Sequence, residues 1–261
     1  MNKRLIIILL LMLTSFSSMR AQENDSAPQQ NLFLICSADS LPTKNGYFTV
    51  IPSLGLFLMD GQIGYAIDNL HCPDFKKMFI SKRANYEKII FSDDKILVKC
   101  EDQLCNLTDS ALNAVAVFPD EDFNIFPGHD NTVEIVSYTD DKSRCYTYDL
   151  TTNEMTPNVQ IDGNVFEMVP VGNGHIIATE HSLYFANDKE CEQLFTIDTE
   201  IVGVALASFG FYFATTNSLY AYDAATGDVY HKLSSDFLTI LGDGSTVYLI
   251  LKDGDVYALE H

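Results

Sequence analysis

Histidine, cysteine and acidic side chains are the residues of this sequence that could bind a metal ion or take part in catalysis. None of the six histidines pairs with another at the spacing that puts two ligands on one helix face, and neither a His-Glu-x-x-His nor a Cys-x-x-Cys motif occurs. His175 and His181 flank a candidate strand and its following turn, so their side chains could approach each other. Ordinary turn and strand-end positions are the better explanation, and the sequence predicts neither a metal site nor a catalytic residue.

Short acidic clusters occur in several expected turns, where carboxylate oxygens could bind calcium. The clusters are Asp93–Asp94, Asp120–Asp122, Asp140–Asp141 and Asp253–Asp255. None repeats the alternating acidic residues, the glycine and the distant glutamate of a calcium-binding loop. Because aspartate is a common turn-forming residue, turn formation explains the clusters. We expect no cofactor, with calcium as a minor alternative.

The six cysteines all follow the N-terminal apolar segment, and many disulfide pairings are conceivable. Cys100 and Cys105 flank a short turn between two strand-like runs, so they could face each other across a hairpin. A free buried cysteine is an equally ordinary fate. A disulfide between these two residues is therefore possible.

The N-terminus has the order of a secretory signal peptide. Lys3 and Arg4 precede the apolar run Leu5–Leu13, and small residues lead to Ala21. A membrane span needs roughly 20 apolar residues, about twice this run. The sequence therefore predicts a cleaved signal peptide at residues 1–21, a polar linker at 22–30, and a periplasmic or secreted location.

The remaining chain has a length that suits one all-β domain, expected at residues 31–261. The net charge of −20 becomes −23 when Lys3, Arg4 and Arg20 leave with the signal peptide. Such a negative charge repels phosphate backbones and anionic membrane surfaces. We expect no nucleic-acid partner and no membrane insertion after signal cleavage.

Short strand-like runs separated by Gly, Asp and Asn continue to the C-terminus without a long stretch of helical periodicity. The segments Ser182–Asn187 and Ser218–Asp223 have nearly the same sequence motif, and variants of this motif recur at intervals of about 40 residues. A unit of this length with four short strands is a propeller blade. The third positions of the six copies are Gly64, Cys105, Tyr146, Tyr184, Tyr220 and Tyr257. The sequence therefore predicts an all-β fold, a single β-propeller of six four-stranded blades.

The fifth and sixth copies show how the ring closes. In the fifth, the expected strands are 202–207, 211–215, 219–222 and 229–233, whereas the sixth has only the three at 237–241, 247–251 and 256–259. The N-terminal run Asn31–Cys36 could supply the missing outer strand. We expect it to close the last blade, which would leave neither edge unpaired.

The segment Leu219–Tyr230, with Asp223 followed by Ala-Ala-Thr-Gly, resembles the repeat of the pyrroloquinoline-quinone-like propeller superfamily. Tyr146–Asn153 matches the same repeat with Asn153 in the glycine place, and the resemblance is good from Ser143 onward. It implies a propeller blade rather than a function. The quinone-dependent members use tryptophan docking, a vicinal disulfide and eight blades. This chain has no tryptophan and no adjacent cysteines, so a quinone site is not expected.

Recurring tyrosines could form an aromatic platform for glycans, but their blade period favours packing between blades. These residues are Tyr146, Tyr148, Tyr184, Tyr220, Tyr222 and Tyr257. Segments that differ between blades are better candidates for ligand contacts. Such segments are Leu41–Asn45, Asn69–Phe75 and Phe118–Asp130.

The sequence favours an exported, non-enzymatic propeller scaffold that binds a protein or cell-envelope partner through one face of the ring. A metal-assisted hydrolase or lactonase with a site in the central channel is one alternative, and a glycan-binding propeller is another. Polar residues at the start of the innermost strands would favour the hydrolase. The residues expected there are apolar: Phe166, Val202 and Phe237.

Overall fold

The structure is a computed structural model of the 261-residue chain. It describes residues 31–43, 46–51, 55–60, 63–67, 75–79, 88–92, 95–107, 112–118, 122–139, 141–187, 190–242 and 244–260. The predicted signal peptide and linker lie outside the described residues. None of the described residues forms a helix that is long and apolar enough to cross a membrane.

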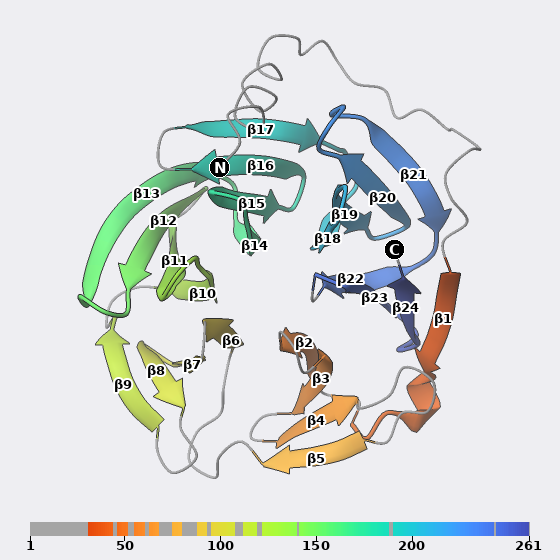
Figure 1. The fold of residues 1–261 in the computed structure, drawn as a ribbon, viewed down its shortest axis with the longest axis horizontal. Coiled ribbons are helices and arrows are strands. Elements are labelled where there is room, and N and C mark those ends of the chain that lie inside the picture. The colour runs from red at the N-terminus through yellow and green to blue at the C-terminus, as the bar shows by residue number, and fades with distance from the viewer. Residues whose placement is uncertain are drawn as a thin grey trace.

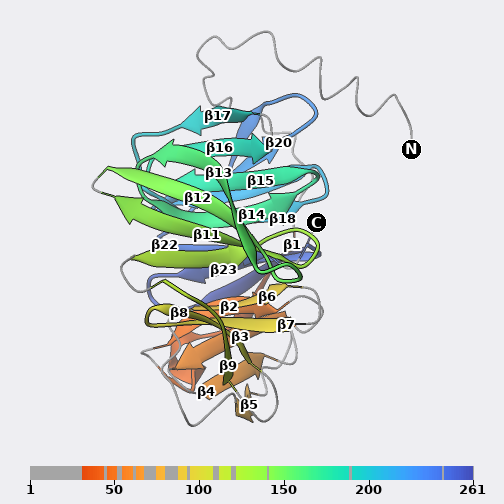
Figure 2. The ribbon, with the colours of Figure 1, turned by 90° about the vertical axis from the view of Figure 1, so that its left-hand side faces the viewer.

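Six antiparallel four-stranded sheets stand around a central axis (Figure 1). In the side view, the strands run across the ring from one face towards the other (Figure 2). Each sheet is one blade, which confirms the predicted six-bladed β-propeller.

The blades follow one another along the chain, and the strands of blades 1 to 5 are ordered from the innermost outward. Blade 1 consists of β2 (Tyr47–Ile51), β3 (Gly55–Asp60), β4 (Ile63–Ile67) and β5 (Phe75–Phe79). Blade 2 consists of β6 (Lys88–Ser92), β7 (Lys95–Cys100), β8 (Gln103–Leu107) and β9 (Leu112–Val117). Blade 3 consists of β10 (Phe123–Pro127), β11 (Thr132–Thr139), β12 (Lys142–Asp149) and β13 (Glu154–Asp162). Blade 4 consists of β14 (Val165–Val171), β15 (Gly174–Thr179), β16 (Ser182–Asn187) and β17 (Cys191–Thr196). Blade 5 consists of β18 (Ile201–Ala207), β19 (Gly210–Thr215), β20 (Ser218–Asp223) and β21 (Val229–Ser234).

Blade 6 is built from both ends of the described chain. Its three C-terminal strands are β22 (Phe237–Gly242), β23 (Thr246–Leu251) and β24 (Val256–Glu260), and β1 (Asn31–Cys36) pairs antiparallel with β24. Phe33 lies opposite Ala258 in this pair. A short 3₁₀ turn, η1 (Ala38–Ser40), follows β1. The predicted closure of the ring by the N-terminal strand is confirmed.

The repeated sequence motif forms the third strand of every blade. Its six anchor positions, from Gly64 to Tyr257, fall in β4, β8, β12, β16, β20 and β24. The turn after this strand also repeats: the Asp223 carboxylate accepts hydrogen bonds from the Ala225 and Thr226 amides at 2.8 and 3.3 Å. Asp149 makes the equivalent contacts in blade 3, and these backbone hydrogen bonds lower the pKa of its carboxyl. The aspartate of the repeat thus folds the turn between the third and fourth strands.

The apolar core is divided among six interfaces between neighbouring blades. Each interface buries side chains from two blades, because a strand directs alternate side chains to the two faces of its sheet. Representative buried pairs, from blade 1/2 around to blade 6/1, are Met59 with Val98, Leu97 with Ile125, Phe126 with Ile177, Leu183 with Phe213, Tyr212 with Ile240, and Ile250 with Leu56.

Candidate functional site

The six innermost strands stand around the axis of the ring (Figure 1), and residues from all six line a cavity of about 430 Å³ in the central channel. A cavity of this size falls in the range that holds small organic ligands. Its wall is mostly apolar and includes Ile89, Ile90, Met168, Val169, Val204, Leu206 and Leu241.

Two charged residues interrupt the apolar wall. Lys88 is the first residue of β6, and Glu167 is the third residue of β14. The pairing of β14 with β15 shifts between Val165 and Glu167, so Phe166 is an extra, unpaired residue. Phe166 packs against the core between blades 4 and 5, while Glu167 lines the channel. Phe166 does lie near the start of this strand, as expected, but the residue after it places a carboxyl group on the channel wall.

The same shift recurs at the start of two further innermost strands. In β18 it leaves Val202 unpaired, and in β22 it leaves Leu238 unpaired. The next paired residues are Gly203 and Thr239, at the position that Glu167 takes in blade 4. This position differs chemically from blade to blade, and only a comparison of the strand registers identifies it.

Burial and opposite charge act against each other on the two charged groups. Burial lowers the pKa of Lys88 to about 8, and the negative charge of Glu167 opposes this shift. Burial also raises the pKa of the Glu167 carboxyl, and the positive charge of Lys88 opposes that shift. The Lys88 ammonium lies 3.5 Å from the centroid of the Phe126 ring, which stabilises the cation.

A polar pocket of about 260 Å³ adjoins Lys88. Lys88 and Lys99 lie opposite each other in the β6–β7 pair, and both line this pocket. The Tyr138 hydroxyl donates a hydrogen bond of 2.7 Å to the Val165 carbonyl in the next blade. The other lining residues are Asp122, Phe123 and Asn124. Lys88 thus belongs to both the apolar cavity and this polar pocket.

Tyr47 lines the apolar cavity from blade 1. Its hydroxyl is buried and has no hydrogen-bond partner among the described residues. Burial raises its pKa to about 12, so the hydroxyl keeps its proton at neutral pH. It is an unused polar group in the wall of the channel.

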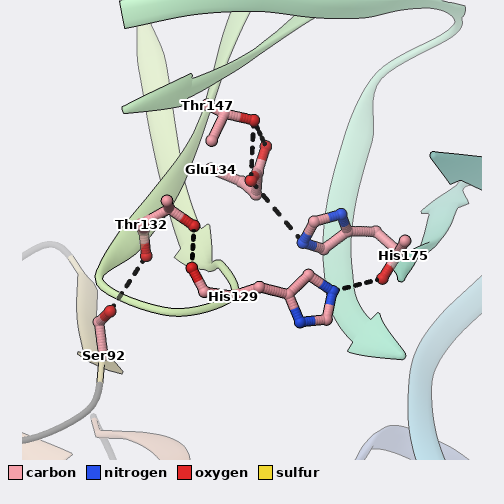
Figure 3. Close-up of polar contacts among 7 residues, drawn as sticks. Ser92, His129, Thr132, Glu134, Thr147 and His175 are labelled. Carbon is pink, nitrogen blue, oxygen red and sulfur yellow. Dashed lines mark hydrogen bonds and ion pairs between the residues drawn. The ribbon is translucent and has the colours of Figure 1, made fainter. Parts of the chain in front are cut away.

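A second polar group of residues lies between blades 3 and 4 (Figure 3), and we call Glu134, Thr147, His129 and His175 the interface cluster. The Thr147 hydroxyl lies 3.0 Å from each oxygen of the Glu134 carboxylate. His175 Nε2 lies 3.7 Å from the same carboxylate, and both side chains are buried. The His129 and His175 rings are 4.9 Å apart between centroids, and His129 Nε2 donates to the Gly174 carbonyl at 2.8 Å.

Strand register explains how the interface cluster forms. Glu134 in β11 lies directly opposite Thr147 in β12, so the hydroxyl reaches the carboxylate within one blade. His175, near the start of β15, comes from the neighbouring blade. Ser92 Oγ in blade 2 donates to the Thr132 carbonyl at 3.0 Å and extends the polar contacts to a third blade. The cluster ties blades together, and its buried position favours a structural role.

The structure does not bring His175 and His181 together. They lie at opposite ends of β15, and the His181 ring lies 3.5 Å from Glu180 at an exposed position. The contacts of His175 are not apparent from the sequence, because its partners come from distant segments of the chain. His129 does lie within Phe118–Asp130, one of the segments expected to differ between blades. The parts of the other two segments at 44–45 and 69–74 lie outside the described residues.

The described acidic turns have structural contacts. The Asp255 amide donates to the Asp253 carboxylate at 3.0 Å, and the Asp255 carboxylate accepts from the Ala38 amide at 2.9 Å. Asp93, Asp94, Asp120, Glu121 and Asp140 lie outside the described residues. Within the described ranges, no three His, Cys, Asp or Glu residues are arranged to hold a metal ion.

Cys100 and Cys105 do not form a disulfide with each other in the structure. Cys100 pairs with Gln103 across the hairpin, and Cys105 pairs with Val98, so the two cysteines lie diagonally rather than directly opposite. Burial raises the pKa of Cys105, and a hydrogen bond with Cys100 opposes the shift. The thiols are therefore neighbours, and their disulfide stays a prediction for the oxidised protein.

The recurring tyrosines belong to the cores between blades, as predicted. Tyr148 and Tyr222 are buried, while Tyr146, Tyr184, Tyr220 and Tyr257 are partly buried against the apolar clusters. Tyr222 stacks on Phe211 with 4.6 Å between ring centroids. These rings do not form an open aromatic platform.

No family model and no curated protein matches the chain. Among solved structures, it is similar to luciferin-regenerating enzyme, with 10% identity, a TM-score of 0.65 and coverage of 89% of this chain and 95% of that chain. A catalytically inactive virginiamycin B lyase from Staphylococcus aureus, solved with quinupristin, has 12% identity, a TM-score of 0.58 and coverage of 85% and 83%. PorZ, a surface component of the type-IX secretion system of Porphyromonas gingivalis, has 12% identity and a TM-score of 0.53; the match covers 88% of this chain but 38% of PorZ. These similarities support the β-propeller fold.

Proposed function

We propose that this protein is exported and that its propeller binds a protein or cell-envelope partner without catalysing a reaction on it. The observation that carries this proposal is the composition of the ring centre. Apolar channel walls adjoin a small set of converging polar groups, Lys88, Lys99 and Asn124, at one end of the innermost strands. Apolar surface with a few placed polar groups is typical of a binding site. We propose that the partner docks on the ring face where β6 and β10 begin.

The charged pair in the channel supports binding over metal-assisted hydrolysis. A divalent ion beside Glu167 would meet the positive charge of Lys88, which already interacts with that carboxylate. The packed positions of the recurring tyrosines likewise give little support to glycan binding through stacked rings.

Export and family membership are part of the same proposal. The N-terminal order of basic, apolar and small residues supports cleavage of a signal peptide and a periplasmic or secreted location. The left-handed backbone at Asn153 and Gly227, with φ of 59° and 76°, supports the pyrroloquinoline-quinone-like repeat, because both residues occupy its glycine place. We propose that the chain is a member of that superfamily without the quinone site.

Site-specific photo-crosslinking in the native cells tests the proposed binding face. A photo-reactive amino acid at the exposed Asp122, beside the polar pocket, should capture one discrete partner. The matched control is Ala225, exposed in the turn after the third strand of blade 5. Antiparallel strands place that turn on the face opposite the start of the innermost strands. Capture from Ala225 alone, or from neither position, contradicts the proposal.

Metal analysis of the purified protein is an independent check. We expect no tightly held divalent ion. A stoichiometric ion that is lost together with a hydrolytic activity on chelation would replace the binding proposal with the hydrolase.

A further inference from the structure

Lys88 lines the central cavity, although lysine side chains usually lie at the protein surface. Lys88 Nζ sits over the Phe126 ring at the edge of a mostly apolar cavity of about 430 Å³. The same lysine also lines the adjoining polar pocket. A primary amine that lies between an apolar cavity and a polar pocket can react with a carbonyl compound whose apolar part enters the cavity.

We propose that Lys88 captures an apolar aldehyde in the central cavity as a reversible imine. This inference concerns the inside of the channel and does not depend on the partner that docks on the ring face.

The reaction is a condensation without oxidation or reduction. The neutral Lys88 amine attacks the aldehyde carbon, and a C–N bond forms as the carbonyl oxygen becomes a hydroxyl group. The hydroxyl then leaves as water, which breaks the C–O bond and needs one proton. The amine in turn gives up its two protons, so that aldehyde and amine yield one imine and one water.

Glu167 is the group placed to move these protons. It is the carboxyl group among the residues that line the described part of the cavity, and its charge interacts with that of Lys88. Burial raises its pKa, so its protonated form can supply the proton to the leaving hydroxyl. Its carboxylate form can take a proton from the amine.

Burial favours the neutral, reactive amine of Lys88, and it outweighs the opposing effects of the Glu167 charge and the Phe126 ring. Desolvation lowers the pKa of Lys88 to about 8, which leaves on the order of a tenth of it neutral at pH 7. The ionisable groups around it are Glu167 in β14, Lys99 in β7, Asp122 before β10 and Tyr138 in β11. Lys142 is the contrasting residue: half-exposed, it forms a salt bridge of 3.1 Å with Asp162.

Reductive trapping tests the proposal on the full exported chain. The protein is incubated with hexanal and cyanoborohydride at pH 7, and peptide mass spectrometry reports hexyl groups on each lysine. We expect Lys88 to be labelled at least about ten-fold faster than Lys142, because burial lowers the pKa of Lys88 and the cavity that it lines can hold the hexyl chain. The labelling rate at Lys88 should rise with pH and level off above about pH 8.

Two variants separate a site-specific reaction from general lysine chemistry. Lys88→Arg keeps the positive charge beside Glu167 but cannot form the imine, so the fast-labelled site should disappear with the fold unchanged by circular dichroism. Glu167→Gln should slow labelling at Lys88 and leave Lys142 unaffected. Equal labelling rates at Lys88 and Lys142 in the unmodified chain, or fast labelling that persists in Lys88→Arg, would overturn the proposal.

Discussion

The second and third strands pair in the same register in blades 3 and 5, but the side chains that blade 3 directs towards blade 4 are polar where those of blade 5 towards blade 6 are apolar. At blade 3/4, Glu134 and Thr147 face each other in one blade and His175 approaches from the next. Tyr146 in blade 3 and Tyr220 in blade 5 occupy the same repeat position, which aligns the two sheets. At the interface between blades 5 and 6, the positions equivalent to Glu134, Thr147 and His175 are occupied by Tyr212, Ala221 and Val247.

The apolar three at blade 5/6 are almost fully buried within one cluster. Glu134 at blade 3/4 is buried to the same degree, with 1% of its surface exposed. The propeller frame therefore accepts either apolar packing or a hydrogen-bonded acid at the same position. We expect a buried charge whose neighbours are apolar to destabilise it.

The largest effect should come from placing the acid alone in the apolar interface. Tyr212→Glu loses a fully buried ring and buries a carboxylate beside Ala221 and Val247, so we expect a loss of about 3–5 kcal/mol in the free energy of unfolding. Urea denaturation measures it. Adding Ala221→Thr and Val247→His supplies the partners found at blade 3/4 and should recover part of the loss. A triple variant no more stable than Tyr212→Glu alone would show that register equivalence does not extend to side-chain chemistry.

The reverse change should cost less. Glu134→Leu removes the carboxylate that Thr147 and His175 face, and we expect a loss of about 2 kcal/mol. Replacing His175 with Val in the same chain should cost less than the two single changes together, with a coupling of about 1 kcal/mol in a double-mutant cycle. His181→Val, at an exposed position, is the control and should stay within about 0.5 kcal/mol. Additive losses at Glu134 and His175 would mean that the 3.7 Å contact contributes nothing to stability.

A third test concerns the half-buried charge of Lys88, which lies in the channel and not at an interface between blades. Because the pKa of Lys88 is lowered in the folded protein, the unfolded chain binds more protons between about pH 8 and the ordinary lysine pKa of 10.5. The unfolding free energy contributed by Lys88 should therefore rise with pH through this range. Relative to Lys88→Met, the unmodified protein should gain on the order of 1 kcal/mol, since solvent screens a partly exposed group. Parallel pH profiles for the two proteins would contradict the shift.

The sequence predicts the ring because the blade-forming residues repeat. The tyrosines of the third strands, the aspartates of the following turns and the glycine position of those turns recur in the same order. The strands of blade 5 begin and end within one residue of their expected bounds. The polar sites could not be predicted in the same way, because Lys88, Glu167, Glu134 and His175 are single departures from the repeat in different blades. One signal was present: Glu134 interrupts the apolar run from Val133 to Val136 in a second strand. The bulges that place Glu167 on the channel wall have no comparable mark in the sequence.

The smallest effect should come from the turn that blades 3 and 5 share. Gly227 and Asn153 both adopt positive φ, which glycine takes freely and asparagine tolerates. Asn153→Gly removes the strain of a side chain in this region, but it also removes the amide oxygen that lies 3.3 Å from the Tyr148 hydroxyl. We expect these changes to offset each other and the unfolding free energy to shift by less than about 0.5 kcal/mol. Gly227→Ala has no such compensation, and we expect it to lower the free energy of unfolding by about 1 kcal/mol. Thermal melts compare the two variants. Equal effects would mean that backbone conformation does not explain the choice of residue at this turn.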